Sequence, residues 1–149
     1  RFPSDMLTDG SEAGNFLNVG ANKKELDKMI AGVFSNYGAT QVDLFAPGVD
    51  MISLDSSSTY SQSNGTSIAA PVVSGVAALV LAYYPELKAK ELIELLMESS
   101  YKPKKPRKVY APNLASKERS KSKFSELAKS GGIINAYRAL QLAEERSTE

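Results

Sequence analysis

Short apolar runs alternate along the chain with turn-forming and charged segments, and this alternation predicts both strands and helices. Three runs have the length and β-prone composition of strands, at residues 16–21, 42–45 and 49–54, and Pro47-Gly48 separates the last two. The stretch 68–84 has no charged residue, is long enough for a helix and ends before Pro85. Strands that alternate with helices are typical of an α/β fold, with helices packed on a sheet.

Further elements follow from local patterns. Residues 89–99 place Leu92, Ile93, Leu96 and Met97 on one stripe, which predicts an amphipathic helix that covers a core. Asn135 precedes the last apolar-periodic segment and is the expected N-cap of a final helix. Asn22 with Glu25 indicates a single helical turn within 22–31. Residues 1–15 and 55–63 are expected to be loops because they are rich in serine and other turn-forming residues.

The uncharged stretch 68–84 could be a buried core helix or a membrane span. It is at the short limit for a span, contains Pro71 and Gly75, and lacks basic flanks. Its many alanines, with Ser74 and Gly75, suit a helix packed closely on a sheet. We therefore expect a buried core helix and no membrane span.

Composition limits the available chemistry. The 149 residues suit one domain or part of one, and 18 Lys and Arg against 17 Asp and Glu leave no global field that would attract a polyanion. The sequence has no cysteine and no histidine, which removes thiolate chemistry and the commonest general base. Any catalysis completed within this chain would have to use Asp, Glu, Lys, Tyr or Ser.

Residues 101–123 differ from the rest, with nine Lys or Arg and three prolines. Clusters of lysine are usually solvated, and only Tyr101 and Tyr110 are present as stacking platforms for bases. The segment is predicted to be a basic surface insertion, and nucleic-acid binding is the disfavoured alternative.

The segment "NGTSIAAP" at 64–71 brings a serine to the start of the apolar helix. If the helix begins near Thr66, Pro71 cannot donate to the carbonyl of Ser67, and the first turn is loosened around that serine. A second interpretation starts the helix one turn later, with Ser67 as N-cap and Pro71 in the first turn. Spacing alone favours the capping role.

A resemblance to a known protein family favours a different role for Ser67. The stretch "NGTSIAAPVVSGVAAL" resembles the nucleophile segment of subtilisin-like serine proteases, the subtilases of peptidase family S8. The segments "FSNYG" at 34–38 and "VDLFAPGVDMIS" at 42–53 are similar to two preceding family segments in the same order. "FPSDMLTDGSEAGNFLNVGA" and "GGIINAYRAL" resemble an earlier loop and strand and the closing turn and helix. The resemblance covers residues 1 to about 100 and 124–143.

The resemblance implies a serine endopeptidase whose acylated nucleophile is Ser67, with the Ser67 N–H as half of an oxyanion hole. Asn64, Gly65 and Thr66 would line the path of a peptide or protein substrate. In the family, the catalytic Asp and His and the oxyanion Asn precede the segment with which this chain opens. The chain alone is therefore expected to be inactive, and the missing N-terminal part of the catalytic domain is its expected partner.

The implied fold is the C-terminal part of a three-layer α/β domain, with a mostly parallel sheet and a buried central helix that starts near Ser67. Residues 1–149 would form this part of one domain, with 101–123 as the insertion. Exposed faces lead us to expect self-association if the chain stands alone. The alternative is a non-catalytic scaffold or binding module of the same fold.

The chain departs from the family pattern in two places. One is the basic segment 101–123, which is longer than in compact subtilases, together with a small expansion at 22–30. The other is Val72, which stands where subtilases commonly have histidine; this alters packing but removes no general base. The related sedolisins share Gly-Thr-Ser, but "NYG" and "VDLFAPG" fit subtilases better. The family implies a secreted or cell-envelope location, with the targeting signal outside this chain. No cofactor is identifiable; calcium is conceivable in the intact protein, and Asp5, Asp9 and Glu12 are expected to be solvated, with no metal site.

Overall fold

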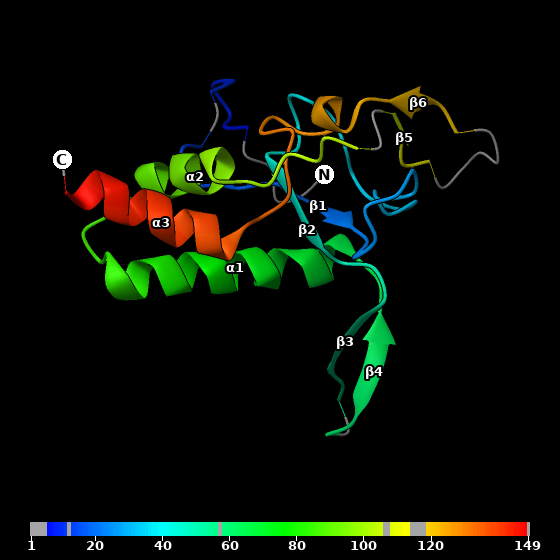
Figure 1. Cartoon of the computed structure of the whole chain (residues 1–149), viewed down its shortest axis with the longest axis horizontal. Coiled ribbons are helices and arrows are strands. Elements are labelled where there is room, and N and C mark those ends of the chain that lie inside the picture. The colour runs from blue at the N-terminus through cyan, green and yellow to red at the C-terminus, as the bar shows by residue number, and fades with distance from the viewer. Residues whose placement is uncertain (1–5, 12, 57, 106–107, 114–118, 149) are drawn as a thin grey trace.

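The computed structural model describes residues 6–11, 13–56, 58–105, 108–113 and 119–148. In chain order the elements are β1 Val19–Asn22, β2 Leu44–Pro47, β3 Met51–Leu54, β4 Tyr60–Ser63, α1 Thr66–Tyr83, α2 Ala89–Glu98, β5 Val109–Tyr110, β6 Lys121–Ser122, the 3₁₀ turn η1 Phe124–Glu126 and α3 Ala136–Ser147. Figure 1 shows the three helices gathered at one end, while the β3–β4 hairpin projects away from the rest.

The centre of the fold is a parallel pair of strands. β1 and β2 pair in parallel, with Val19 opposite Leu44 and Asn22 opposite Pro47. A parallel bridge between Phe45 and Ile133 adds the segment before α3 on the other side of β2. Helix α1 packs along both strands and against α3, which also contacts α2. The expected α/β arrangement is thus present, and its parallel strands are those that the helices cover.

The other two strand pairs are antiparallel hairpins. The β3–β4 hairpin pairs Leu54 with Tyr60, although the sequence predicted a loop from residue 55 to residue 63. The prediction was wrong for residues 60–63, because "YSQS" has few of the apolar residues by which a strand is recognised. One face of the hairpin exposes Ile52, Leu54 and Tyr60, at 74%, 70% and 73% of their surface. At this exposure the three side chains form an apolar surface without a partner among the described residues. An isolated two-stranded hairpin is only marginally stable in water.

Two apolar clusters form the core. The first joins β1, β2 and the three helices, and it contains Leu44, Val80, Leu95 and Leu96. The second lies on the other side and contains Ile30, Phe45, Val109, Phe124 and Leu127; the rings of Phe45 and Phe124 are 5.1 Å apart between centroids. Val109 and Ala111 belong to the segment 101–123, so part of the predicted surface insertion is anchored in the core.

The segment after β1 does not form the helical turn that the sequence indicated within 22–31. Asn22 is in β1, and its side-chain amide donates to the carbonyl of Lys23 instead of capping a helix. The backbone closes a loop in which Lys23 N–H donates to the Ile30 carbonyl over 2.7 Å. Ile30 and Ala31 are buried in the second cluster, and Ala31 forms a bridge with Asn22. These contacts outweigh the local helix signal.

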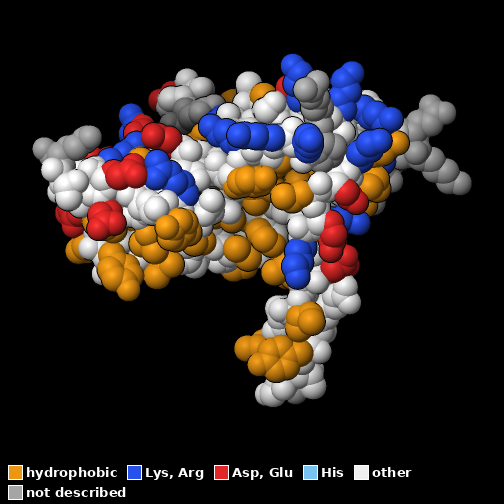
Figure 2. All heavy atoms as spheres, in the orientation of Figure 1, with side chains coloured by type: hydrophobic (Ala, Val, Ile, Leu, Met, Phe, Trp, Pro, Cys, Tyr) orange, Lys and Arg blue, Asp and Glu red, His pale blue; other side chains and the backbone are white. Residues whose placement is uncertain are grey.

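Helix α1 begins at Thr66, two residues before the predicted stretch 68–84, and ends at Tyr83, one residue before the end of that stretch. Only Ala69, Val73 and Val80 are buried within the helix. The opposite face is open, and Figure 2 shows apolar side chains along that side of the molecule. By length and composition alone, α1 is long and apolar enough to cross a membrane, and 17% of its residues are buried. The expected burial of this helix is therefore realised on one face, the one that packs on β1, β2 and α3.

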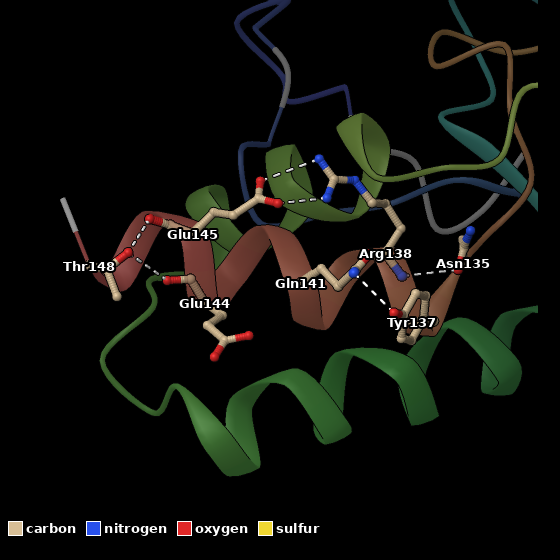
Figure 3. A network of polar contacts seen from close by, with 7 residues as sticks. All are labelled: Asn135, Tyr137, Arg138, Gln141, Glu144, Glu145 and Thr148. Atoms are coloured by element: carbon tan, nitrogen blue, oxygen red, sulfur yellow. Dashed lines mark hydrogen bonds and ion pairs between the residues drawn. The ribbon is translucent and has the colours of Figure 1, made fainter.

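Helix α3 begins where the sequence predicted. Asn135 Oδ1 accepts a hydrogen bond from the N–H of Arg138 over 3.1 Å, which caps the first turn. Figure 3 shows this cap together with the paired hydrogen bonds from Arg138 to Glu145. Those bonds to the Glu145 carboxylate raise the pKa of Arg138. The helix then packs Ala139, Leu142 and Ala143 into the first cluster.

Replacing Asn135 with alanine is expected to lower the free energy of unfolding by about 1 kcal/mol, because one N–H of the first turn loses its acceptor. Urea unfolding followed by circular dichroism measures the change. The matched control is Glu145→Gln on the exposed side of the same helix, which should cost less than about 0.5 kcal/mol because an exposed ion pair contributes little. Equal losses in the two variants would contradict the assigned cap.

Candidate active site

The segment 64–67 connects β4 to α1 and is tied to the turn between β2 and β3. Gly65 N–H donates to the Gly48 carbonyl over 2.9 Å. Asn64 Oδ1 accepts from the N–H of Asp50 over 2.7 Å. Two contacts from one neighbouring turn thus fix the backbone and the side chain just before Thr66 and Ser67.

Two glycines allow close packing at this point. A Cβ on Gly65 would lie 2.8 Å from Ser67 Oγ, so the hydroxyl would have to rotate away from it. A Cβ on Gly48 would lie 2.6 Å from the Gly65 carbonyl oxygen and 2.9 Å from the Cβ atoms of Ala21 and Ala69. The absence of side chains at these two positions therefore lets the Gly65 backbone approach the turn and leaves room beside the serine hydroxyl.

Ser67 is the second residue of α1 and does not cap it. The residue before the helix is Gly65, which has no side-chain cap, and the N–H groups of Ile68 and Ala69 both donate to the Gly65 carbonyl, over 3.1 and 3.2 Å. Pro71 is inside the helix and has no N–H to donate to the Ser67 carbonyl. The capping interpretation of Ser67 is wrong for this structure, and the first turn lacks the hydrogen bond that residue 71 would otherwise donate.

Ser67 is exposed at the N-terminal end of α1. Its side chain is exposed, and its hydroxyl has no hydrogen-bond partner among the residues that the structure describes. The first turn of α1 contains no acidic residue that would neutralise the positive end of the helix dipole. Helix N–H groups without partners can stabilise negative charge that develops on a group next to this hydroxyl. The general base that would activate it cannot be a histidine of these 149 residues, since the sequence has none.

The structure brings together the four predicted site residues as one exposed corner. Asn64 and Ser67 are exposed, while Gly65 and Thr66 are half-buried. Sequence reasoning missed Gly48 and Asp50, whose backbone groups bind this corner. The Pro-Gly turn signal at 47–48 was visible, but its contact with a segment 17 residues further on required the fold.

The acidic cluster expected to be solvated is described only in part. Asp5 and Glu12 lie outside the described residues. The Asp9 carboxylate accepts from the hydroxyl and the N–H of Ser11, which lowers the pKa of Asp9. Within the described part of the chain, no three Asp or Glu side chains gather as a metal site would require.

Comparison with known proteins places this geometry in a family. Residues 3–129 match the peptidase S8, or subtilase, family. Subtilisin DY of Bacillus licheniformis is 48% identical over 59 residues, which are 40% of this chain and 21% of that protein. The crystal structure of a cold-adapted subtilisin-like serine proteinase is 35% identical, with a TM-score of 0.56 over 61% of this chain and 32% of that one.

A further structural neighbour agrees in fold. The A-subunit of the AB5 toxin from E. coli has a TM-score of 0.64 at 23% identity, and covers 85% of this chain and 37% of that one. The family match extends over most of the sequence, so the chain belongs to the subtilase family. It spans less than half the length of each of these three relatives. Membership of this family supports a serine protease function.

Proposed function

We propose that this chain carries the nucleophile of a serine endopeptidase and that Ser67 forms the acyl-enzyme. The observation that carries the proposal is the placement of Ser67: exposed, at the N-terminus of α1, with a glycine two residues before it that leaves space at Oγ. Asn64, Gly65 and Thr66 are proposed to line the path of the peptide substrate. The family match supports the reaction class.

The chemistry of the chain's own residues follows from this geometry. Ser67 Oγ would attack the substrate carbonyl and lose its proton to a general base, and the leaving amine would take a proton before water releases the acyl group. The N–H of Ser67 is free to donate to the developing oxyanion, because no acceptor for it lies among the described residues. The base and a second oxyanion donor are proposed to come from a preceding part of the same domain.

The open surfaces support a missing partner of this kind. The outer face of α1 exposes Ala70, Ser74, Gly75 and Ala78, and the hairpin face exposes Ile52, Leu54 and Tyr60. Large apolar side chains are exposed on both elements, including Leu79 and Tyr83 on α1, and contiguous apolar surface of this kind marks contact sites. We propose that the N-terminal part of the catalytic domain covers these faces in the intact protein, and that chain 1–149 alone self-associates and is inactive.

Gly75 offers a test of this covering. A Cβ added at Gly75 meets no atom within 4 Å, so Gly75→Ala is expected to raise the free energy of unfolding of chain 1–149 by about 0.5–1 kcal/mol through helix propensity. In the intact protein the same methyl group would enter a packed face and lower the unfolding midpoint. Chemical denaturation of both proteins measures the two changes in stability. Stabilisation of both would contradict the proposal that the N-terminal part covers this face of α1.

A secreted or cell-envelope location is proposed from the family alone. The alternative function, a non-catalytic module of the same fold, is disfavoured by the space kept free at Ser67 Oγ, because a scaffold does not need Gly65 there. Calcium in the intact protein remains a proposal without ligands in the described part of this chain.

The test is hydrolysis of a fluorescently quenched protein substrate by the intact protein and by chain 1–149. We expect hydrolysis by the first and none by the second, since triad members act as a unit. Hydrolysis by chain 1–149 alone would show that the base is misassigned. No hydrolysis by a folded intact protein would favour the non-catalytic module.

A further inference from the structure

A pocket of about 310 Å³ opens next to the segment that carries Ser67. Asn64 forms part of its wall, and Val33, Phe34 and Val49 line it with apolar surface. Asn64 is three residues before Ser67, and three residues of extended chain span at most about 11 Å. A peptide bound at Ser67 would therefore reach the pocket within about three of its own residues.

Arg119 is held at this pocket by neutral groups. Its guanidinium donates to the carbonyls of Ala111 and Tyr110, over 3.2 and 3.5 Å, and approaches Met29 Sδ at 3.6 Å. The same group lies over the Tyr110 ring, 5.5 Å from its centroid. These contacts orient the guanidinium without neutralising it, and no carboxylate pairs with Arg119 among the residues that the structure describes.

A second cationic side chain and one acidic side chain also line the pocket. Lys23 is half-buried there and has no ion pair within the described ranges. Asp50 is the acidic residue of the wall, and its Oδ1 accepts from Gln62 Nε2 over 3.0 Å. The pocket thus combines an apolar floor with two cations against one carboxylate. Figure 2 shows that Lys and Arg side chains gather on the side of the molecule that carries β5 and β6.

We propose that this pocket binds an acidic side chain, glutamate in particular, of the peptide held at Ser67. The inference rests on the proposed function and adds substrate preference to it. The methylene groups of glutamate suit the apolar floor, and a guanidinium already oriented by carbonyls binds a carboxylate through paired hydrogen bonds. Lys23 and Arg119 come from the segments 22–30 and 101–123, so the preference belongs to segments outside the nucleophile motif.

The experiment measures peptide binding to the intact protein with Ser67→Ala, so that nothing is cleaved. The probes are fluorescein-labelled eight-residue peptides of alanine and leucine, with glutamate or glutamine at each position in turn, and anisotropy gives Kd. At one position we expect glutamate to bind about fivefold to tenfold more tightly than glutamine, since the ion pair is partly shielded from water. The preference should shrink in about 1 M salt.

Two variants and one control assign the preference to the pocket. Arg119→Gln and Lys23→Met should each reduce the glutamate preference to less than about twofold at the same salt. Lys104→Met is the control, because Lys104 is exposed and does not line the pocket. Should Arg119→Gln fail to fold, Lys23→Met alone decides the question.

Three outcomes are distinguishable. Equal Kd values for glutamate and glutamine peptides at every position, or a preference that survives both pocket variants, overturn the inference. Hydrolysis of substrates by the wild-type protein without such a preference leaves the proposed protease function standing and removes only the pocket. A glutamate preference in a protein that hydrolyses nothing keeps the pocket as a peptide site and removes the protease function.

Discussion

Replacement of Ser67 by alanine is expected to lower kcat of the intact protein by about a million-fold, a scale taken from subtilisin, which belongs to the same family. The reason is that Oγ supplies the bond that forms in the acyl-enzyme. The fold should be unaffected, because the hydroxyl is exposed and bonds to no described residue. Hydrolysis of a fluorogenic peptide gives the rate, and circular dichroism confirms folding.

Ser147→Ala is the matched control for this variant. Ser147 is exposed at the end of α3, away from the outer face of α1, and donates to the Glu144 carbonyl over 2.9 Å. Its loss should change kcat by less than about threefold, consistent with a surface substitution that affects stability by less than about 0.5 kcal/mol. A Ser67→Ala protein that kept more than about one per cent of wild-type turnover would exclude Ser67 as the nucleophile.

Gly48→Ala is the second large effect that we expect. The new Cβ would lie 2.6 Å from the Gly65 carbonyl oxygen, which is backbone and cannot rotate away as a side chain would. The segment that holds Ser67 must then shift, at a cost of about 1–3 kcal/mol in stability. A displacement of about 1 Å at a reacting group costs about a hundredfold in rate.

Denaturation and kcat of the same preparation measure both effects of Gly48→Ala. Gly14→Ala is the control, because a Cβ at Gly14 meets no atom within 4 Å. It should change the free energy of unfolding by less than about 0.5 kcal/mol. A Gly48→Ala protein with normal stability and normal turnover would show that the contact between the turn and the nucleophile segment is not needed.

The elements that the sequence predicted well are those with a strong local signal. The limits of α2 and α3 follow from their apolar stripes and from Asn135, and both are confirmed in type and place. The start of α1 depends on Gly65 and Pro71, which point to different first turns. Contacts of Gly65 with Gly48, which are remote in sequence, decide between them.

The elements that the sequence missed depend on tertiary contacts. Residues 22–31 carry a helix signal, but burial of Ile30 and the bridge to Asn22 hold them as a loop. β4 has a polar sequence, and its pairing with β3 supplies the order that its composition does not. Val109 is placed in the core although lysines surround it in the sequence.

The candidate site divides in the same way. Ser67 and the three residues before it could be proposed as site residues from the sequence because the family motif is contiguous. The pocket beside them was not, since Lys23, Asn64 and Arg119 are far apart in the sequence and meet only in the fold. The charge of Arg119 gave no signal of its own among the nine cations of segment 101–123.

Mapping the reactive serine tests most directly whether Ser67 is the nucleophile. The intact protein is treated with a fluorophosphonate, digested, and analysed by mass spectrometry, with chain 1–149 alone treated in parallel. We expect one stoichiometric adduct on Ser67 in the intact protein and no adduct on Ser67 in the chain alone. An intact, folded protein that is labelled on another serine, or on none, would contradict the assignment of Ser67 as the nucleophile.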